Sequence, residues 1–308
     1  MSANASTKVI IAALLGNAAI SITKFFAAFM TGSSAMLSEG IHSLVDTGNQ
    51  ILLLYGLKQA KKPADEAFPF GHGKEVYFWS FVVAILIFAV GAGVSIYEGI
   101  RHVMHPSQIE NPMMNYIVLG VAMFFEGSAW LFAFKEFGKT KGKYGYIEAV
   151  QRGKDPSMFV VLFEDSAALL GLLIAMSGIW LTQMTGIAVF DGIASILIGL
   201  ILGGTAIWLA IETKGLLIGE GANTEVTKSI RQIAQSFDEV EQVNELLTMY
   251  MGPDFLLVNI SIRFKRGQLT REIEAVIQQL DSAIKAQHKM VQRVFVEAER
   301  TLHSPPVK

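Results

Sequence analysis

A long apolar stretch over residues 34–57 contains ionisable side chains, and no other feature of the sequence constrains the fold as strongly. At about 1.5 Å per residue, a helix of this length crosses the ~30 Å hydrocarbon core of a bilayer. With about 3.6 residues per turn, one face of that helix carries Glu39, His42, Asp46 and Asn49. A charged side chain at the bilayer centre costs roughly 2.5–3.5 kcal/mol, so we expect this polar stripe to face protein, water or a bound ion.

Two members of the stripe have the spacing of metal ligands. His42 and Asp46 are i, i+4 neighbours, so their side chains can share one ligand. An imidazole nitrogen beside a carboxylate suits Zn²⁺, Fe²⁺, Co²⁺ or Mn²⁺. The alternative is a polar patch that pairs with neighbouring helices or lines a wet cavity without binding metal. The spacing by itself leaves both interpretations open.

The composition indicates a membrane part joined to a soluble part. Of 308 residues, 52% are hydrophobic and only 17% are charged, and the mean hydropathy is positive. A net charge of −2 gives no reason to expect a nucleic-acid partner. The absence of cysteine excludes disulfides and thiolate metal sites, which leaves His, Asp, Glu and Asn as ligands. No nucleophile with its base, phosphate loop or cofactor fingerprint is present, so we expect neither an enzyme nor a prosthetic group.

Six stretches are long and apolar enough to be membrane spans. They cover residues 9–30, 34–57, 77–97, 113–134, 158–184 and 187–211. The connections after the second and fourth spans are basic, with Lys58, Lys61, Lys62, Lys74, Lys135, Lys139, Lys141, Lys143, Arg152 and Lys154. The positive-inside rule therefore places both basic loops and both termini in the cytoplasm.

Acidic residues also lie inside the fourth and fifth predicted spans. Glu164 and Asp165 are adjacent, and neighbouring residues on a helix point about 100° apart, so we expect only one of them to face the same point as the stripe. The other could meet a neighbouring helix or a water path, and a plain alternative is that both cap the start of the span. Glu126 could be a ligand, a proton carrier or half of a structural ion pair.

The residues after the last span have the pattern of a small α/β domain. The sequence predicts helices over residues 224–236 and 270–287, and strands over residues 240–251, 255–264 and 291–297. The order αββαβ predicts a two-layer domain with helices on one face of a sheet. We therefore divide the chain into a transmembrane domain, residues 1–211, and a cytoplasmic domain, residues 212–308.

Three motifs resemble those of a known family. Residues 31–46 read TGSSAMLSEGIHSLVD, residues 70–75 read FGHGKE, and residues 191–199 read DGIASILIG. Together with six spans and an αββαβ tail, they resemble the cation diffusion facilitators, a family of divalent-metal transporters. The resemblance covers nearly the whole chain. It implies a six-helix membrane bundle with a ferredoxin-like cytoplasmic domain that forms a homodimer, and transport by proton antiport.

The same resemblance implies a tetrahedral metal site built by two residues on span two and two on span five. The span-two pair corresponds to His42 and Asp46, and the second span-five position to Asp165, but the first falls on Val161, which cannot bind metal. The Glu-Asp pair at 164 and 165 resembles the branch that contains zinc transporter 9 of animals. We therefore expect Glu164, or else Glu126 or Asn49, to supply the missing ligand. An oxygen-rich site leaves Mn²⁺, Fe²⁺ and Co²⁺ open beside Zn²⁺.

Two accessory sites of the family look degraded in this sequence. Asp65 and His72 match a peripheral loop site, but Phe68 and Pro69 stand where another histidine would help. The tail positions of the family's dinuclear site carry no aligned histidine, so we expect that site to be absent or weak; they are Asn259, Glu297 and Glu299.

The function implied is efflux of a divalent transition metal, Zn²⁺ first, from the cytoplasm across a bacterial inner membrane. The alternatives are a membrane-anchored metal sensor or interaction protein, and a metal channel. Acidic residues inside spans argue against a mere anchor, because an anchor has no use for them.

Overall fold

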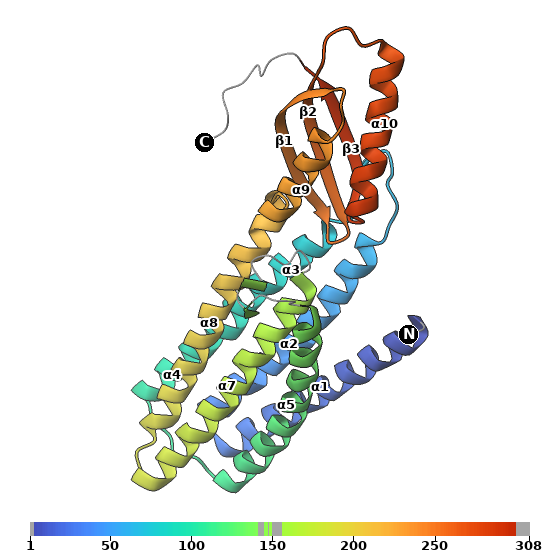
Figure 1. The fold of residues 1–308 in the computed structure, drawn as a ribbon. Coiled ribbons are helices and arrows are strands. Elements are labelled where there is room, and N and C mark those ends of the chain that lie inside the picture. The colour runs from blue at the N-terminus through green and yellow to red at the C-terminus, as the bar shows by residue number, and fades with distance from the viewer. Residues whose placement is uncertain (1–2, 141–144, 147, 150–155, 300–308) are drawn as a thin grey trace. The chain divides into compact units, whose positions relative to one another are not determined.

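The computed structural model describes residues 3–140, 145–146, 148–149 and 156–299 (Figure 1). Part of the second basic loop, with Lys141, Lys143, Arg152 and Lys154, lies outside the described residues. The chain divides into two compact units. The helical unit comprises residues 1–57 and 78–214, and the tail unit comprises residues 58–77 and 215–308.

Long helices occupy the places of all six predicted spans (Figure 1). They are α1 (Ala3–Thr31), α2 (Ser34–Ala60), α3 (Glu75–Leu86) continued by the π-helical segment η1 (Ile87–Ala92) and α4 (Gly93–Met104), α5 (Pro112–Thr140), α7 (Pro156–Thr185) and α8 (Val189–Ile218). Within the described residues, four segments are long and apolar enough to cross a membrane: Glu75–Met104, Pro112–Lys135, Phe159–Thr185 and Val189–Ile218. The polar stripe makes α2 less apolar than these four. Spans by α1 and α2 remain predictions.

Glycines allow α4 and α8 to approach with their backbones in contact. A Cβ atom at Gly99 would lie 2.7 Å from the Gly192 carbonyl oxygen and 2.7 Å from the Ile196 amide nitrogen. A Cβ atom at Gly199 would lie 3.0 Å from the Ala92 carbonyl oxygen. Small residues at such crossings let membrane helices pack closely, so these glycines fix the distance between the two helices.

Asp191 of α8 holds the first turn of α2. Its carboxylate accepts a 2.6 Å hydrogen bond from the Ser33 hydroxyl group, and it also accepts the backbone N–H groups of Ser34 and Ala35. The side chain is fully buried. An acid placed at a helix N-terminus satisfies amide donors that have no partner within the helix. Asp191 therefore caps α2 from another helix, in addition to lying near the start of its own.

The tail unit has the predicted αββαβ order. It consists of α9 (Thr224–Gln235), β1 (Val240–Gly252), β2 (Phe255–Phe264), α10 (Thr270–Gln287) and β3 (Val291–Ala298). The central strand β2 pairs antiparallel with β1 and parallel with β3. Alternate residues of β2 are fully buried, namely Leu256, Val258, Ile260 and Ile262. Because α9 and α10 contact each other as well as the sheet, both helices cover this buried face.

The other face of the sheet exposes apolar side chains. Leu247 of β1 and Phe295 of β3 flank Asn259 of β2 across the sheet, and both are about half exposed. Within the same unit, the ring of Phe70 from the loop before α3 meets the Phe295 ring edge to face. That loop approaches the β1–β2 hairpin so closely that Gly73 has no room for a side chain beside the Met251 carbonyl group.

Candidate metal site

All four members of the polar stripe on α2 face the protein. Glu39, His42 and Asn49 are at most 1% exposed, and the side chain of Asp46 is 16% exposed. Leu44, on the opposite face of the same helix, is exposed. The helix therefore turns its ionisable side into the bundle and its apolar side outward, as the spacing predicts.

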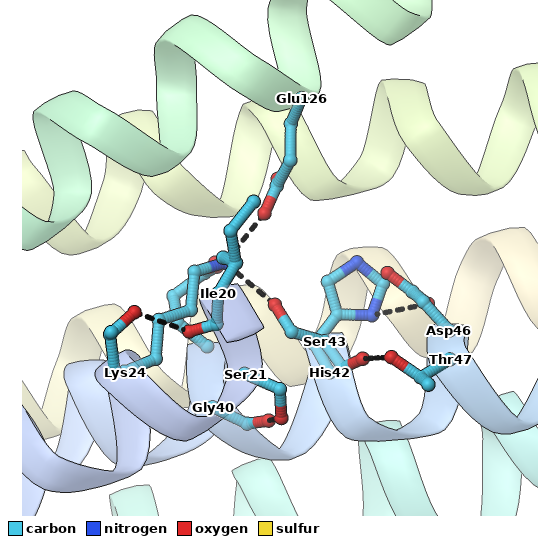
Figure 2. A network of polar contacts seen from close by, with 11 residues as sticks. Ile20, Ser21, Lys24, Gly40, His42, Ser43, Asp46, Thr47 and Glu126 are labelled. Carbon is cyan, nitrogen blue, oxygen red and sulfur yellow. Dashed lines mark hydrogen bonds and ion pairs between the residues drawn. The ribbon is translucent and has the colours of Figure 1, made fainter. Parts of the chain in front are cut away.

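His42 and Asp46 lie side by side on α2, with 3.3 Å between Nδ1 and a carboxylate oxygen (Figure 2). Both ring nitrogens of His42 and the Oδ1 atom of Asp46 are buried without a hydrogen-bond partner in the described part of the chain. Buried polar atoms are normally satisfied, and unsatisfied ones carry a desolvation cost of about 1–3 kcal/mol. A cation or water between them would remove that cost.

Glu164 of α7 completes the cluster from the opposite side. Its carboxylate accepts a 2.5 Å hydrogen bond from the Asn49 amide group and interacts with the carboxyl group of Asp46. Glu164 is 4% exposed. Two buried carboxylates repel each other unless a cation or a proton lies between them. His42, Asp46, Asn49 and Glu164 thus gather the donor types that suit a divalent transition metal.

Asp165 points to a different place from Glu164, as expected for adjacent helical residues. It lines a cavity of about 450 Å³, hereafter the site cavity, together with Asp46 and Glu126. Asp46 is therefore the residue that belongs both to the buried cluster and to the cavity. Among the described residues, no three His, Asp or Glu side chains converge closely enough to hold a metal as they stand. Binding would require side-chain rotation around Asp46.

Glu126 is engaged by a lysine. Lys24 of α1 is fully buried, and its ammonium group lies 2.8 Å from Glu126, 3.0 Å from Glu39 and 2.8 Å from the Ser43 hydroxyl group. Figure 2 shows Glu126 reaching from α5 to the region of Lys24 and Ser43. Of the three roles open to Glu126 in the sequence, its position favours the structural ion pair.

The two accessory positions lie in the tail unit. His72 and Asp65 are 2.9 Å apart, and the hydrogen bond from His72 lowers the pKa of Asp65. The Phe68 ring packs against the His72 ring at a 45° tilt and offers no ligand. In the sheet, the Asn259 amide group donates to Glu297 at 2.8 Å, and the Ser261 hydroxyl group donates to Glu299 at 2.9 Å. These tail residues bond to one another.

Sequence reasoning missed the partners that organise the site. A lysine inside a span can reach the membrane interface or pair with an acid, and an acid in the first turn of a helix is common, so the sequence identifies no particular partner for Lys24 or Asp191. Their burial was the missing information. A signal was present, because Asp191 lies within one of the three family motifs and Lys24 is a lone charge inside a predicted span.

A helical bundle with buried acidic residues on several helices is typical of membrane transporters for cations. The family model described as the cation efflux transmembrane domain matches residues 10–218. The chain therefore belongs to the cation efflux, or cation diffusion facilitator, family and is an integral membrane protein.

Curated relatives refine this assignment. The chain is 33% identical over 266 residues to the mitochondrial proton-coupled zinc antiporter SLC30A9 of Xenopus laevis, covering 86% of this chain and 48% of that protein. It is 30% identical to metal tolerance protein C4 of Arabidopsis thaliana, over 86% of this chain and 58% of that protein. It is 22% identical to the manganese efflux system protein MneP of Bacillus subtilis, over 94% and 95% of the two chains. The chain lies near the SLC30A9 branch and spans about half the length of the SLC30A9 proteins it matches.

Proposed function

We propose that this protein is a secondary active exporter that moves a divalent transition metal cation, Zn²⁺ first, out of the cytoplasm in exchange for protons. The observation that carries the proposal is the buried cluster of His42, Asp46, Asn49 and Glu164, in which two carboxyl groups adjoin and several nitrogen and oxygen atoms have no hydrogen-bond partner among the described residues. Such a cluster is expensive to bury unless it binds a cation. Relatives named as zinc antiporters and manganese efflux proteins support the same class of substrate.

Proton exchange follows from competition for the same atoms. A neutral imidazole and a carboxylate bind a metal cation, whereas their protonated forms do not. Acidity on the far side would release the metal, and a higher cytoplasmic pH would favour loading. Asp165 and Asp46 both line the site cavity, so that cavity gives ions and water a route to the cluster.

The proposed arrangement in the cell follows the charge of the loops. Both termini and both basic loops would lie in the cytoplasm of a bacterial inner membrane, with residues 1–211 as the transport domain. Residues 212–308 would form the cytoplasmic domain and join two copies into a homodimer. Bilayer lipid would surround the exposed apolar side chains of the helical unit. The peripheral pair Asp65 and His72 would add at most a weak second site.

The deciding experiment is metal uptake into liposomes that contain the purified chain. A panel of Zn²⁺, Mn²⁺, Fe²⁺, Co²⁺ and Cd²⁺ is offered while a dye reports the lumenal pH. We expect uptake of one or two metals with matched movement of protons in the opposite direction. Metal flux that is independent of a pH gradient and saturates poorly would support a channel instead. A folded dimer that moves none of the five metals would favour the membrane-anchored sensor.

A further inference from the structure

The ion cluster of Lys24, Glu39 and Glu126 lies between two cavities of the helical unit. The site cavity of about 450 Å³ contains Asp46 and Glu126. A second cavity of about 660 Å³, hereafter the distal cavity, is lined by Phe25, Leu37 and other residues near the first turn of α2. Of the metal cluster, Asp46 lines the site cavity, and none of its four residues lines the distal cavity.

The order of residues along two helices places the cluster between these cavities. On α1, Ile20 lines the site cavity, Phe25 lines the distal cavity, and Lys24 lies between them in sequence. On α2, the residues that line the distal cavity end at Leu37, and those that line the site cavity begin at Ser43. Because both helices are continuous, residues between two positions also lie between them in space.

The cluster and its neighbours fill the space between the two cavities. The three N–H groups of an ammonium ion match the three acceptors of Lys24, which come from α2 and α5. On the other side of Lys24, the Phe25 ring covers Gly40 so closely that a Cβ atom there would lie 3.2 Å from it. α7 also contacts the cluster, because the Glu39 carboxylate occupies the space that a side chain at position 171 would need.

We propose that Lys24, Glu39 and Glu126 form an ion-pair gate that separates the site cavity from the distal cavity and opens when the metal site faces the other side of the membrane. The inference rests on the proposed transport function, in which the metal site must be closed to one side of the membrane at a time. Buried ion pairs add little net stability relative to apolar packing, but they can specify one arrangement over another. Within the described part of the chain, one carboxylate oxygen of Glu39 and one of Glu126 have no hydrogen-bond partner, and both can take up water once the three helices separate.

The chain contains no cysteine, so single reporters can be introduced without background. Leu54→Cys places a thiol in the site cavity, and Leu37→Cys places one in the distal cavity. Each variant is reconstituted as the full chain without metal, and a membrane-impermeant maleimide is added to one side at a time. With the gate intact, we expect the thiol at position 54 to react from one side only and the thiol at position 37 from the other.

Breaking the gate should let the reagent reach each thiol from both sides of the membrane; we call its restriction to one side the sidedness of labelling. Lys24→Gln deletes charge-assisted hydrogen bonds, so the reagent on the distal side should modify position 54 about tenfold faster or more. Glu126→Gln, which keeps the size of the side chain, tests the same point if Lys24→Gln does not reach the membrane. Lys58→Gln, the same change at an exposed lysine of α2, should leave both rates unchanged.

Unchanged sidedness in correctly assembled Lys24→Gln or Glu126→Gln protein would overturn the gate and leave the cluster with a structural role. The wild-type chain is assayed for metal uptake in the same liposomes. Absence of uptake would count against the proposed function, whereas uptake with unchanged sidedness in the variants would count against the gate alone.

Discussion

Glu39 and Asp46 lie on the same face of α2, yet their carboxyl groups have different partners. Glu39 pairs with Lys24, whereas Asp46 lies beside His42 and Glu164. The Lys24 ammonium group lies 3.0 Å from one oxygen of the first carboxylate and balances its charge. The second has no such partner among the described residues, so in this structure the stripe contains one acid paired with a lysine and one that is available to a cation.

Substituting either α2 ligand should stop transport without unfolding the protein. We expect Asp46→Ala and His42→Ala to abolish metal uptake into liposomes, because each removes donor atoms from the cluster. Both variants should still elute as the wild-type oligomer. Thr47→Val is the matched control, since Thr47 neighbours Asp46 but bonds to the Ser43 carbonyl group of its own helix. Normal uptake by Asp46→Ala would refute the site assignment.

The two adjacent acids of α7 should differ in their contribution to metal binding. Glu164 touches Asp46 and Asn49, whereas Asp165 lines the site cavity. We expect Glu164→Gln to eliminate measurable binding, and Asp165→Asn to weaken it by about 10–100-fold, as for a residue next to the ligands. Titration calorimetry of the purified variants compares them directly. The opposite order would make Asp165 the ligand, as the family motif implies.

The loop pair in the tail unit should respond to pH. The hydrogen bond from His72 lowers the pKa of Asp65 below its usual value of about 4. The stabilisation of the loop is therefore present above that usual value and is lost as the pH falls through the lower, folded value. In His72→Ala, the pKa of Asp65 should rise toward its usual value, which carbon NMR of the labelled full chain measures. No rise would show that the Phe68 backbone, the second donor to Asp65, dominates.

The sequence predicts the relative positions of site residues that lie on one helix, but not of those that lie on different helices. The face shared by His42, Asp46 and Asn49 follows from helical geometry, and the sequence predicts it correctly. The pairing of Lys24 with Glu126 joins residues of α1 and α5, 102 positions apart. Periodicity within a single segment contains no information on such a pair, because it depends on how the helices are rotated against each other.

At the scale of elements, α4 and α8 depend on glycine for their close contact. Gly99→Ala should destabilise the helical unit by about 1–3 kcal/mol, because the new methyl group would meet backbone atoms of α8 that cannot rotate away. Gly204→Ala on α8 is the control, since no atom of the described residues lies within 4 Å of a Cβ atom there. Thermal unfolding of both variants in the same detergent measures the difference. Equal stability would mean that α4 and α8 can separate slightly without loss.

Element boundaries followed from the sequence where local signals were strong. α10 covers residues 270–287 as predicted, and β2 covers residues 255–264 as predicted, because turn residues delimit both. The π-helical segment η1 inside the third span was not predicted, since an apolar sequence gives no local sign of a changed hydrogen-bond pattern. The capping of α2 by Asp191 was missed for the same reason as the Lys24 pair: it joins distant helices.

For the whole molecule, the tail sheet offers the surface on which the proposed homodimer can be tested. α9 and α10 cover one face of the sheet, while Leu247 (52% exposed) and Phe295 (45% exposed) lie on the other. Apolar side chains that lie together on an open sheet face indicate an interaction surface. A second copy of the chain is the occupant that the family resemblance implies.

Leu247→Asp should weaken that dimer while leaving the tail folded. Burying a large apolar side chain contributes about 1.5–3 kcal/mol, and placing a charge there reverses the sign, so the dissociation constant should rise by about tenfold or more. Light scattering after size exclusion in detergent measures the change over a range of concentrations. Leu269→Asp is the control, because Leu269 is equally exposed but lies at the start of α10. If Leu247→Asp remains dimeric at every concentration, the open sheet face does not hold the two copies together.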